Sequence, residues 1–240
     1  MRIYPAIDIK NGNCVRLKQG KFNEITIYDE DPLQTALKWA ECGATYLHLV
    51  DLDGALVGNT VNLEVIKKIA QKISIPIQLG GGIRTMASIE QKLSLGIQRV
   101  ILGTVAIQDP SFVKEAIRRF GKDHIVVGID AKDGKVAIEG WEKVSPFSAV
   151  ETCLQMKEIG VETIIYTDIS KDGMLSGPNV EATKNLIEQT NMNIIASGGV
   201  TNIGDLKALQ QIQVEGAIIG KALYQGFLDL STVIQQFETR

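Results

Sequence analysis

Cysteine, histidine and aromatic residues are all scarce in this chain of 240 residues, and each shortage excludes a class of protein. The three cysteines, Cys14, Cys42 and Cys153, are odd in number and far apart, unlike a disulfide framework or a zinc knuckle. There are two histidines, and no set of His, Asp or Glu residues has metal-ligand spacing. Motifs of nucleotide-binding glycine loops and serine hydrolases are also lacking. The sequence therefore predicts no metal site and no nucleotide cofactor.

A dominant charge and a long hydrophobic run are absent as well. The 25 basic and 28 acidic residues give a net charge of −3 with no basic block, which argues against nucleic acid as a partner. No run approaches the roughly 20 apolar residues of a membrane helix, and the first residues show no signal-peptide pattern. We therefore expect a cytoplasmic, monomeric enzyme or binding protein with no membrane contact.

Eight short apolar runs recur along the chain, each followed by a segment with helical periodicity. They are nearly continuous in hydrophobicity, as in parallel strands covered by helices. Asp31-Pro32 and Asp109-Pro110 each combine an N-cap carboxylate with a proline in the first helical turn. Eight such units in about 250 residues indicate a closed (β/α)₈ TIM barrel, with a doubly wound open sheet as the alternative. The runs are residues 3–7, 46–50, 75–79, 100–102, 125–129, 163–166, 194–196 and 216–219.

The chain also repeats itself at about half its length, which favours the barrel. Glycines 81 and 82 recur at 198 and 199, and Gly103 recurs at Gly220, all at an offset of 117. The segment around Asp8 recurs around Asp130, and residues 53–58 recur as residues 172–177. We predict one domain over residues 1–240, built from two (βα)₄ half-barrels that span approximately residues 1–122 and 123–240.

Repeated glycines end four of the expected strands, at the face where TIM barrels place their active sites. Glycine lets backbone N–H groups approach an anion closely, and a helix N-terminus adds the positive end of its dipole. Tight turns alone would also explain a single glycine pair, but the matched pairs favour two phosphate sites. Lys221 lies beside the second pair and is expected to neutralise its anion. Two sites on opposite sides of one barrel mouth imply a long substrate with a phosphate at each end.

Asp8 and Asp130 end the first and fifth expected strands, between the two phosphate sites. Paired carboxylates can divide acid and base roles, although an aspartate after a strand can also cap a turn. Thr167 ends the sixth strand where its counterpart is Val50, and its hydroxyl group could orient a substrate or a carboxylate. Three further aspartates lie close by and could contribute to the site, but turn capping is the role expected for each: Asp51, Asp168 and Asp172.

Two loops at this face, residues 9–30 and 131–144, are longer than the others. Asn11-Gly12 and Asp133-Gly134 predict type I′ hairpin turns in them. Arg16 in the first loop could bind an anionic substrate, and Trp141 in the second could stack on a heterocycle, unless each packs on its own hairpin. His48, inside the second strand, is expected to be a hydrogen-bonded histidine of the barrel core, or one that supports substrate binding, rather than a metal ligand. His124 falls at the opposite end of the barrel.

Several segments together resemble the isomerase family of histidine biosynthesis, over essentially the whole chain. The segments are Pro5-Ala6-Ile7-Asp8-Ile9-Lys10-Asn11-Gly12, Val15-Arg16-Leu17, Asp51-Leu52-Asp53-Gly54-Ala55, Gly80-Gly81-Gly82-Ile83-Arg84, Thr167-Asp168-Ile169 and Asp172-Gly173. The family converts the aminoaldose phosphoribosylformimino-aminoimidazole-carboxamide ribotide (ProFAR), which carries two phosphates, to its ribulosyl isomer. That isomer, the aminoketose PRFAR, forms by an Amadori rearrangement. The resemblance implies no metal and no organic cofactor.

The resemblance also implies roles for particular residues. Asp130 would be the acid that opens the sugar ring, Asp8 the base that takes the C2 proton, and Thr167 a positioning group. Arg16, His48 and Trp141 would bind the substrate. Phosphate contacts would fall on Gly81, Gly82, Arg84, Gly103, Thr104, Ser197, Gly198, Gly199, Gly220 and Lys221.

Two related activities are alternatives. The cyclase of the same pathway shares the repeat and both phosphate sites, but its opening has a cysteine where this chain has Ala6. A bifunctional isomerase that also accepts phosphoribosylanthranilate uses the same chemistry, so the two aspartates do not separate it from the first reading.

Overall fold

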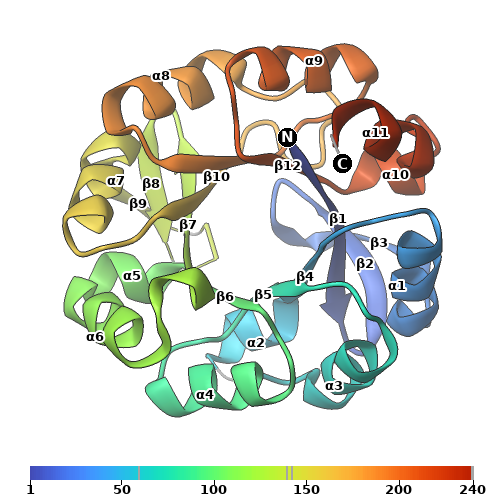
Figure 1. Cartoon of the computed structure of the whole chain (residues 1–240), viewed down its shortest axis with the longest axis horizontal. Helices are drawn as coiled ribbons and strands as arrows, with labels where there is room; N and C mark the ends of the chain where they lie inside the picture. Colours follow the sequence, from blue (N-terminus) through green and yellow to red (C-terminus); the bar gives the residue numbers. More distant parts are fainter. Residues whose placement is uncertain (59, 139, 142, 239–240) are drawn as a thin grey trace.

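Eight parallel strands close into a barrel, which Figure 1 shows end-on. The computed structural model describes residues 1–58, 60–138, 140–141 and 143–238. β12 pairs with β1, and β7 pairs with β10, so the ring has no open edge. The closed ring confirms the predicted TIM barrel over the open sheet. Its strands are β1 (Arg2–Lys10), β4 (Leu47–Asp51), β5 (Ile77–Gly80), β6 (Arg99–Leu102), β7 (Ile125–Lys132), β10 (Thr163–Asp168), β11 (Asn193–Ser197) and β12 (Gly216–Ile219).

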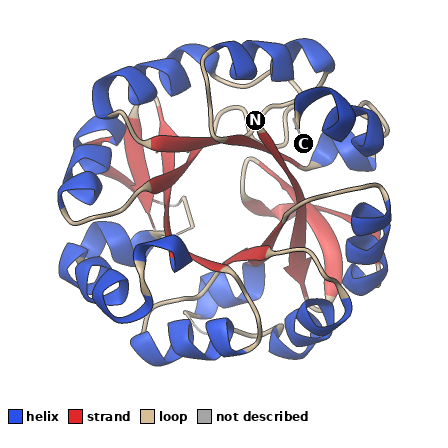
Figure 2. Cartoon of the chain, viewed as in Figure 1, coloured by secondary structure: helices blue, strands red, loops and turns tan. Residues whose placement is uncertain are grey.

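Helices surround the ring on its outer face (Figure 2). Asp31 and Asp109 accept backbone N–H groups at the starts of α1 and α6, with proline in the first turn, as the sequence predicts. Among the described residues, no helix is long and apolar enough to cross a membrane. The helices are α1 (Pro32–Glu41), α2 (Leu52–Val57), α3 (Leu63–Lys72), α4 (Met86–Ser94), α5 (Thr104–Gln108), α6 (Pro110–Phe120), η1 (Lys122–His124, a 3₁₀ turn), α7 (Ala149–Glu158), α8 (Val180–Thr190), α9 (Ile203–Gln211), α10 (Lys221–Tyr224) and α11 (Leu230–Phe237).

The side chains form two apolar layers, one on each face of the strands. Since side chains alternate along a strand, Ile3 and Ile7 of β1 face the helices, while Tyr4 and Ala6 face the barrel interior. The next inward position on β1 is Asp8, at the C-terminal end of the barrel. The interior layer is filled by Tyr4, Ala6, Tyr46, Val126, Ile165, Ile195 and Ile218, with Ile101 against them.

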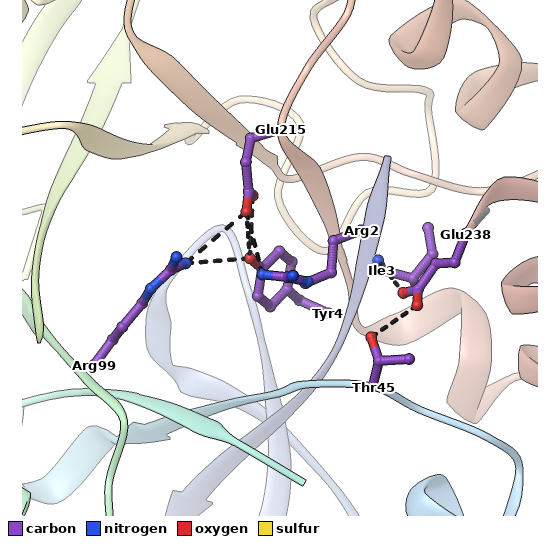
Figure 3. A network of polar contacts seen from close by, with 7 residues as sticks. All are labelled: Arg2, Ile3, Tyr4, Thr45, Arg99, Glu215 and Glu238. Carbon is purple, nitrogen blue, oxygen red and sulfur yellow. Dashed lines mark hydrogen bonds and ion pairs between the residues drawn. The ribbon is translucent and has the colours of Figure 1, made fainter. Parts of the chain in front are cut away.

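A polar network closes the N-terminal end of the barrel (Figure 3). Tyr4 donates its hydroxyl proton to Glu215 at 2.9 Å, and the guanidinium groups of Arg2 and Arg99 lie 3.5 and 3.9 Å from the same carboxylate. Beside it, Glu238 accepts from the Ile3 backbone and the Thr45 hydroxyl group, both at 2.7 Å (Figure 3). These side chains bind one another across the ring, so this end serves stability.

Two hairpins extend from the opposite, C-terminal end, where the sequence predicts long loops. In the first, β2 (Asn13–Lys18) pairs antiparallel with β1, and β3 (Lys21–Asp29) pairs with β2. In the second, β8 (Lys135–Ile138) pairs antiparallel with β7, and β9 (Lys143–Ser148) pairs with β8. Both central residues of each turn have positive φ, at 49° and 78° for Asn11-Gly12 and 50° and 75° for Asp133-Gly134. The type I′ turns are therefore confirmed. In the second loop, Glu139 and Glu142 lie outside the described residues.

Candidate active site

A cavity of about 300 Å³ occupies the mouth of the barrel, between the C-terminal ends of the strands and the two hairpins. Every residue that the sequence suggests for the site lines it. They are Asp8, Arg16, His48, Gly81, Gly82, Arg84, Gly103, Thr104, Asp130, Trp141, Thr167, Ser197, Gly198, Gly199, Gly220 and Lys221. The ring topology brings these distant segments together, as the position of active sites in TIM barrels predicts.

Asp8 forms an ion pair with Arg16 of the first hairpin. The Nη1 of Arg16 lies 2.6 Å from Oδ2 of Asp8, and its Nη2 donates to the Ala6 carbonyl oxygen at 3.4 Å. A Cβ at Gly220 would overlap the guanidinium group, which also lies 5.7 Å from the centre of the Tyr224 ring. Burial is the largest single influence and lowers the pKa of Arg16, but Asp8, Tyr224 and Asp172 together outweigh it and raise the pKa. Arg16 thus joins the first aspartate to the second glycine site and is a cation inside the cavity.

Asp130 has neutral partners instead. Nε1 of Trp141, in the second hairpin, donates to Oδ2 of Asp130 at 2.7 Å. The Thr167 hydroxyl group on the neighbouring strand also bonds this carboxylate, and the two residues are paired in register. Burial raises the pKa of Asp130, while the bonds from Trp141 and Thr167 act in the opposite direction. The net effect favours the protonated form of this carboxyl group more than water does.

Asp172 is a third carboxylate in the cavity, and it also accepts the backbone N–H of Gly173 in its own turn. It follows β10 and lines the cavity, where burial raises its pKa to about 6. Arg16 opposes this shift, while the charges of Asp8 and Asp130 add to it. The only sequence signal for a role of Asp172 in the site is its position just after the sixth strand. That signal is weak, because many turn residues have such a position.

Asp51 and Asp168 do hold turns, as expected. Asp51 accepts from the backbone N–H of Gly54 and from the Asn62 side chain, at 2.9 and 2.7 Å. Asp168 accepts from the Ser170 backbone and from the Asn179 side chain, at 2.9 and 2.6 Å. Both carboxylates are buried in these bonds and do not line the cavity.

The two hairpins meet over the cavity. A Cβ at Gly20, in the turn between β2 and β3, would overlap the indole ring of Trp141. The neighbouring Gln19 donates its backbone N–H to the carbonyl oxygen of Asp172, and its side-chain amide to that of Ser170, both at 3.2 Å. The first hairpin is therefore docked on the second hairpin and on the segment after β10. This arrangement covers the three carboxylates.

His48 lies below Asp8, on the neighbouring strand. Its register partner on β1 is Ala6, and Asp8 pairs with Val50. Nδ1 of the ring lies 3.0 Å from Nε2 of Gln78, which sequence reasoning missed because no motif marks a single glutamine in a strand. Burial, with the charge of Arg16, lowers the pKa of His48 to about 3, so its imidazole is neutral. The core position expected for His48 is confirmed, and the ring also reaches the cavity.

The first glycine site lies after β5 and β6. Gly81 and Gly82 have φ of 101° and 70°, and a Cβ at Gly81 would overlap the Asp51 carbonyl oxygen. Gly103 precedes α5, whose first residue is Thr104, and no side chain caps that helix. Arg84 donates to the Ala55 carbonyl oxygen at 3.1 Å, beside Gly58. Its side chain thus bonds the end of α2 at the edge of the cavity.

The second glycine site, after β11 and β12, has the same form. Gly198 and Gly199 have φ of 92° and 89°, and a Cβ at Gly199 would overlap the Gly177 carbonyl oxygen. Gly220 precedes α10 with no side-chain cap, and Lys221 donates to the Gly173 carbonyl oxygen at 2.9 Å. Close packing already requires glycine at Gly81 and Gly199, whereas a Cβ at Gly103 would meet no atom within 4 Å. The phosphate contacts stay a prediction.

Within the described ranges, no group of three or more His, Cys, Asp and Glu side chains is arranged to hold a metal ion. The three cysteines are free thiols. The chemistry available at the mouth is therefore that of three carboxyl groups, one buried guanidinium group, a neutral imidazole and a threonine hydroxyl group. Such a set can move protons and bind anions.

Comparisons with known proteins agree with this geometry. The family described as "Histidine biosynthesis protein" matches residues 2–229. A protein of Lachnoclostridium phytofermentans is 59% identical over 99% of this chain and 100% of its own length. Proteins of Thermoanaerobacter pseudethanolicus (54%; 98% and 99% covered) and Listeria monocytogenes (52%; 98% of each) are similar over the same span. All three are named 1-(5-phosphoribosyl)-5-((5-phosphoribosylamino)methylideneamino)imidazole-4-carboxamide isomerase.

Proposed function

The chain belongs to the histidine biosynthesis protein family and is an isomerase of that pathway, and we propose that Asp8 and Asp130 carry its proton transfers. The reaction is the Amadori rearrangement of the aminoaldose ProFAR to the aminoketose PRFAR. The observation that carries the proposal is the contrast between the two carboxyl groups in one cavity. Asp8 is ion-paired with Arg16, whereas Asp130 has only neutral partners and a raised pKa.

Each aspartate then has one task. Asp130 gives its proton to the ring oxygen as the C1–O bond breaks, and the nitrogen lone pair forms a C1=N double bond. Asp8 takes the proton from C2, the electrons of that bond form the C1=C2 bond of an enolamine, and the second electron pair of C1=N returns to the nitrogen. The enolamine then becomes the ketone as its O2 proton is lost and C1 gains one, so no electrons leave the substrate. Thr167 holds the Asp130 carboxyl group in place.

Asp172 supports these transfers as a third proton-holding group. With a pKa of about 6, its carboxyl group exchanges a proton near neutral pH, where general acid–base catalysis is most effective. Its electrostatic coupling to Asp8 and Asp130 means that each change of charge in the reaction alters the proton affinity of the others. The site thus brings three carboxyl groups together with the guanidinium group of Arg16.

The two glycine sites are proposed to bind the two phosphates of the substrate. Each site combines glycines of positive φ after one strand with an uncapped helix start after the next strand. Arg84 and Thr104 add polar groups on one side, and Ser197 and Lys221 on the other. We further propose that a monomer in the cytoplasm acts on this bisphosphorylated ribotide.

The test is turnover of ProFAR by purified protein, followed by the absorbance change of PRFAR formation without added metal. Asp8→Asn and Asp130→Asn should each lower kcat about 10³-fold, since general acid–base groups contribute on that order. Asp123→Asn is the control, because Asp123 is exposed in η1 at the far end of the barrel, and it should keep full activity.

An unchanged kcat in both aspartate variants would contradict the assignment. Phosphoribosylanthranilate, supplied in a parallel assay, tests the bifunctional alternative, which requires turnover of both substrates by one cavity. Because the same aspartates would serve both reactions, the variants should lose both activities together.

A further inference from the structure

A pair of buried polar side chains interrupts the apolar interior of the barrel. Gln78 on β5 is fully buried, His48 on β4 is 8% exposed, and the two are register partners on neighbouring strands. The interior positions around them hold Ala6, Ile101, Ile165, Ile195 and Ile218. Burying a polar pair there costs hydration free energy. That cost must be offset by other interactions or by a function of the pair.

The hydrogen bond between the pair fixes where the imidazole carries its proton. The ring is neutral, since burial and Arg16 disfavour its charge, so one nitrogen carries hydrogen and the other accepts. Gln78 directs its amide nitrogen at Nδ1, at 3.0 Å, so Nδ1 accepts and Nε2 carries the proton. Nε2 is then the ring nitrogen left for the cavity that His48 lines.

The opposite orientation of the Gln78 amide is less favourable. As it stands, the carbonyl oxygen of Gln78 is buried without a partner among the described residues. If the amide were turned by 180°, its oxygen would accept a hydrogen bond from a protonated Nδ1 of His48. The amide nitrogen would then lose its acceptor and become an unpaired buried NH₂ group. Unpaired buried N–H groups are rarer in proteins than unpaired carbonyl oxygens.

We propose that Gln78 is a positioning residue that holds His48 in its Nε2–H tautomer, so that His48 donates a hydrogen bond to an oxygen of the ribose chain next to Asp8. His48 lies one inward position below Asp8 on the neighbouring strand, so this donor faces the part of the substrate from which Asp8 takes a proton. The neutral donor stabilises negative charge that develops on that oxygen. This inference rests on the proposed function for the identity of the substrate. The tautomer of His48 follows from its contact with Gln78 and is independent of the substrate.

The second half of the chain offers a natural control for the pair. At the offset of 117 that relates the glycine sites, His48 corresponds to Ile165 and Gln78 to Ile195, both buried in the barrel interior. The same interior position is therefore filled by two isoleucines on one side and by a hydrogen-bonded pair on the other. Packing alone does not require the polar pair.

The first experiment reads the tautomer directly, by two-bond ¹H–¹⁵N correlation spectra of the labelled full chain at pH 7 without substrate. The chain has two histidines, which makes the spectrum simple. His124 serves as an internal standard, because its Nδ1 lies 2.6 Å from the carbonyl oxygen of Gln98 and must carry a proton. We expect the opposite state for His48, with Nδ1 unprotonated and Nε2 protonated. A protonated Nδ1 at His48 overturns the proposal.

The second experiment exchanges each residue for its counterpart, as Gln78→Ile, His48→Ile and the double variant. We expect kcat/KM for ProFAR to fall about 100-fold in His48→Ile and about 10-fold in Gln78→Ile, mainly through kcat. The His48 signals of Gln78→Ile should show a mixture of tautomers. The double variant should be no slower than His48→Ile, because Gln78 acts through the ring alone.

Losses that multiply in the double variant would mean that Gln78 acts independently of His48 and would overturn the proposal. Unchanged kcat/KM in Gln78→Ile would overturn it too. Melting temperatures of the three variants separate a folding defect from a defect in the site. If the wild-type chain did not turn over ProFAR at all, the proposed function would fail, and the spectrum would still decide the tautomer.

Discussion

The two hairpins at the mouth of the barrel place an aspartate and its partner in the same way, but with different chemistry. β2 returns along β1 and brings Arg16 to Asp8, and β8 follows β7 into the segment that brings Trp141 to Asp130. One carboxylate thus meets a cation and the other a neutral indole N–H. The backbone fixes where each carboxyl group lies, and the partner determines whether a charged or a neutral donor faces it.

The turns after β4 and β10 show the same contrast more strongly. Asp53 and Asp172 are counterparts in the repeat, and each is followed by glycine. Burial alone would raise the pKa of Asp53, but hydrogen bonds from Asn62 and Asn11, with the charge of Lys10, outweigh it and lower the pKa. Asp172 has a raised pKa of about 6 in the cavity. Only the second turn contributes a carboxyl group to the site.

The sharpest test of the hairpin comparison is to remove the cation. Arg16→Met should lower kcat/KM about 10³-fold, because the buried carboxylate of Asp8, the proposed base, loses its charged partner and the space beside Gly220 opens. Steady-state kinetics with ProFAR measure the loss. Arg16→Lys, which keeps the charge without the planar fork, should recover part of it. If Arg16→Met lowered kcat/KM no more than Trp141→Phe does, the two hairpins would not differ as described.

The turn comparison predicts opposite effects on stability. The raised pKa of Asp172 means that its ionisation destabilises the fold; the penalty is absent below its ordinary pKa of 3.8 and complete above about 6. Asp172→Asn should therefore be more stable than wild type at pH 7, by about 2–3 kcal/mol, and equal to it near pH 3.5. Urea unfolding at the two pH values measures the difference.

Asp53→Asn is the matched variant for that experiment. Because the pKa of Asp53 is lowered, its carboxylate stabilises the fold above its ordinary pKa, and this contribution disappears as the pH falls through the lowered value. The variant should be less stable than wild type at pH 7 and equal to it in acid. The same sign of change at pH 7 in both variants would show that the two turns do not differ as described.

The smallest predicted effect is that of Trp141→Phe. The variant keeps the ring but removes the bond from Nε1 to Asp130, so kcat should fall about 10-fold as the carboxyl group loses its fixed orientation. That bond lowers the pKa of Asp130, so its removal raises the pKa further and the acid stays protonated to higher pH. The alkaline limb of the pH profile of kcat should therefore move upward.

Trp39→Phe is the control for this shift. Trp39 is the other tryptophan, buried in the core between strands and helices, and its indole N–H has no partner within the described part of the chain. The substitution should change the melting temperature without moving either limb of the pH profile. A shift of the alkaline limb in Trp39→Phe, or none in Trp141→Phe, would break the link between the indole and Asp130.

Local patterns were enough to predict much of the fold. Apolar runs gave the eight strands, Asp-Pro pairs gave helix starts, and Asn11-Gly12 and Asp133-Gly134 gave the hairpin turns, because each depends on neighbouring residues alone. The division into half-barrels at residue 122 stays a prediction, supported by the matching hairpins. The partners of Arg16 and the roles of Asp172 and Gln78 could not be predicted from local patterns, because they depend on residues far away in the chain.

The sequence by itself determined which residues stand at the C-terminal ends of the strands, since strand period and repeat offset are properties of the chain. Tertiary structure alone decided what those residues do. Asp53 and Asp172 carry the same local signal, yet one lies among Asn11, Asn62 and Lys10 and the other faces Arg16 and two carboxylates. Burial and charge around a carboxyl group come from segments far away in the chain, and these set its proton affinity.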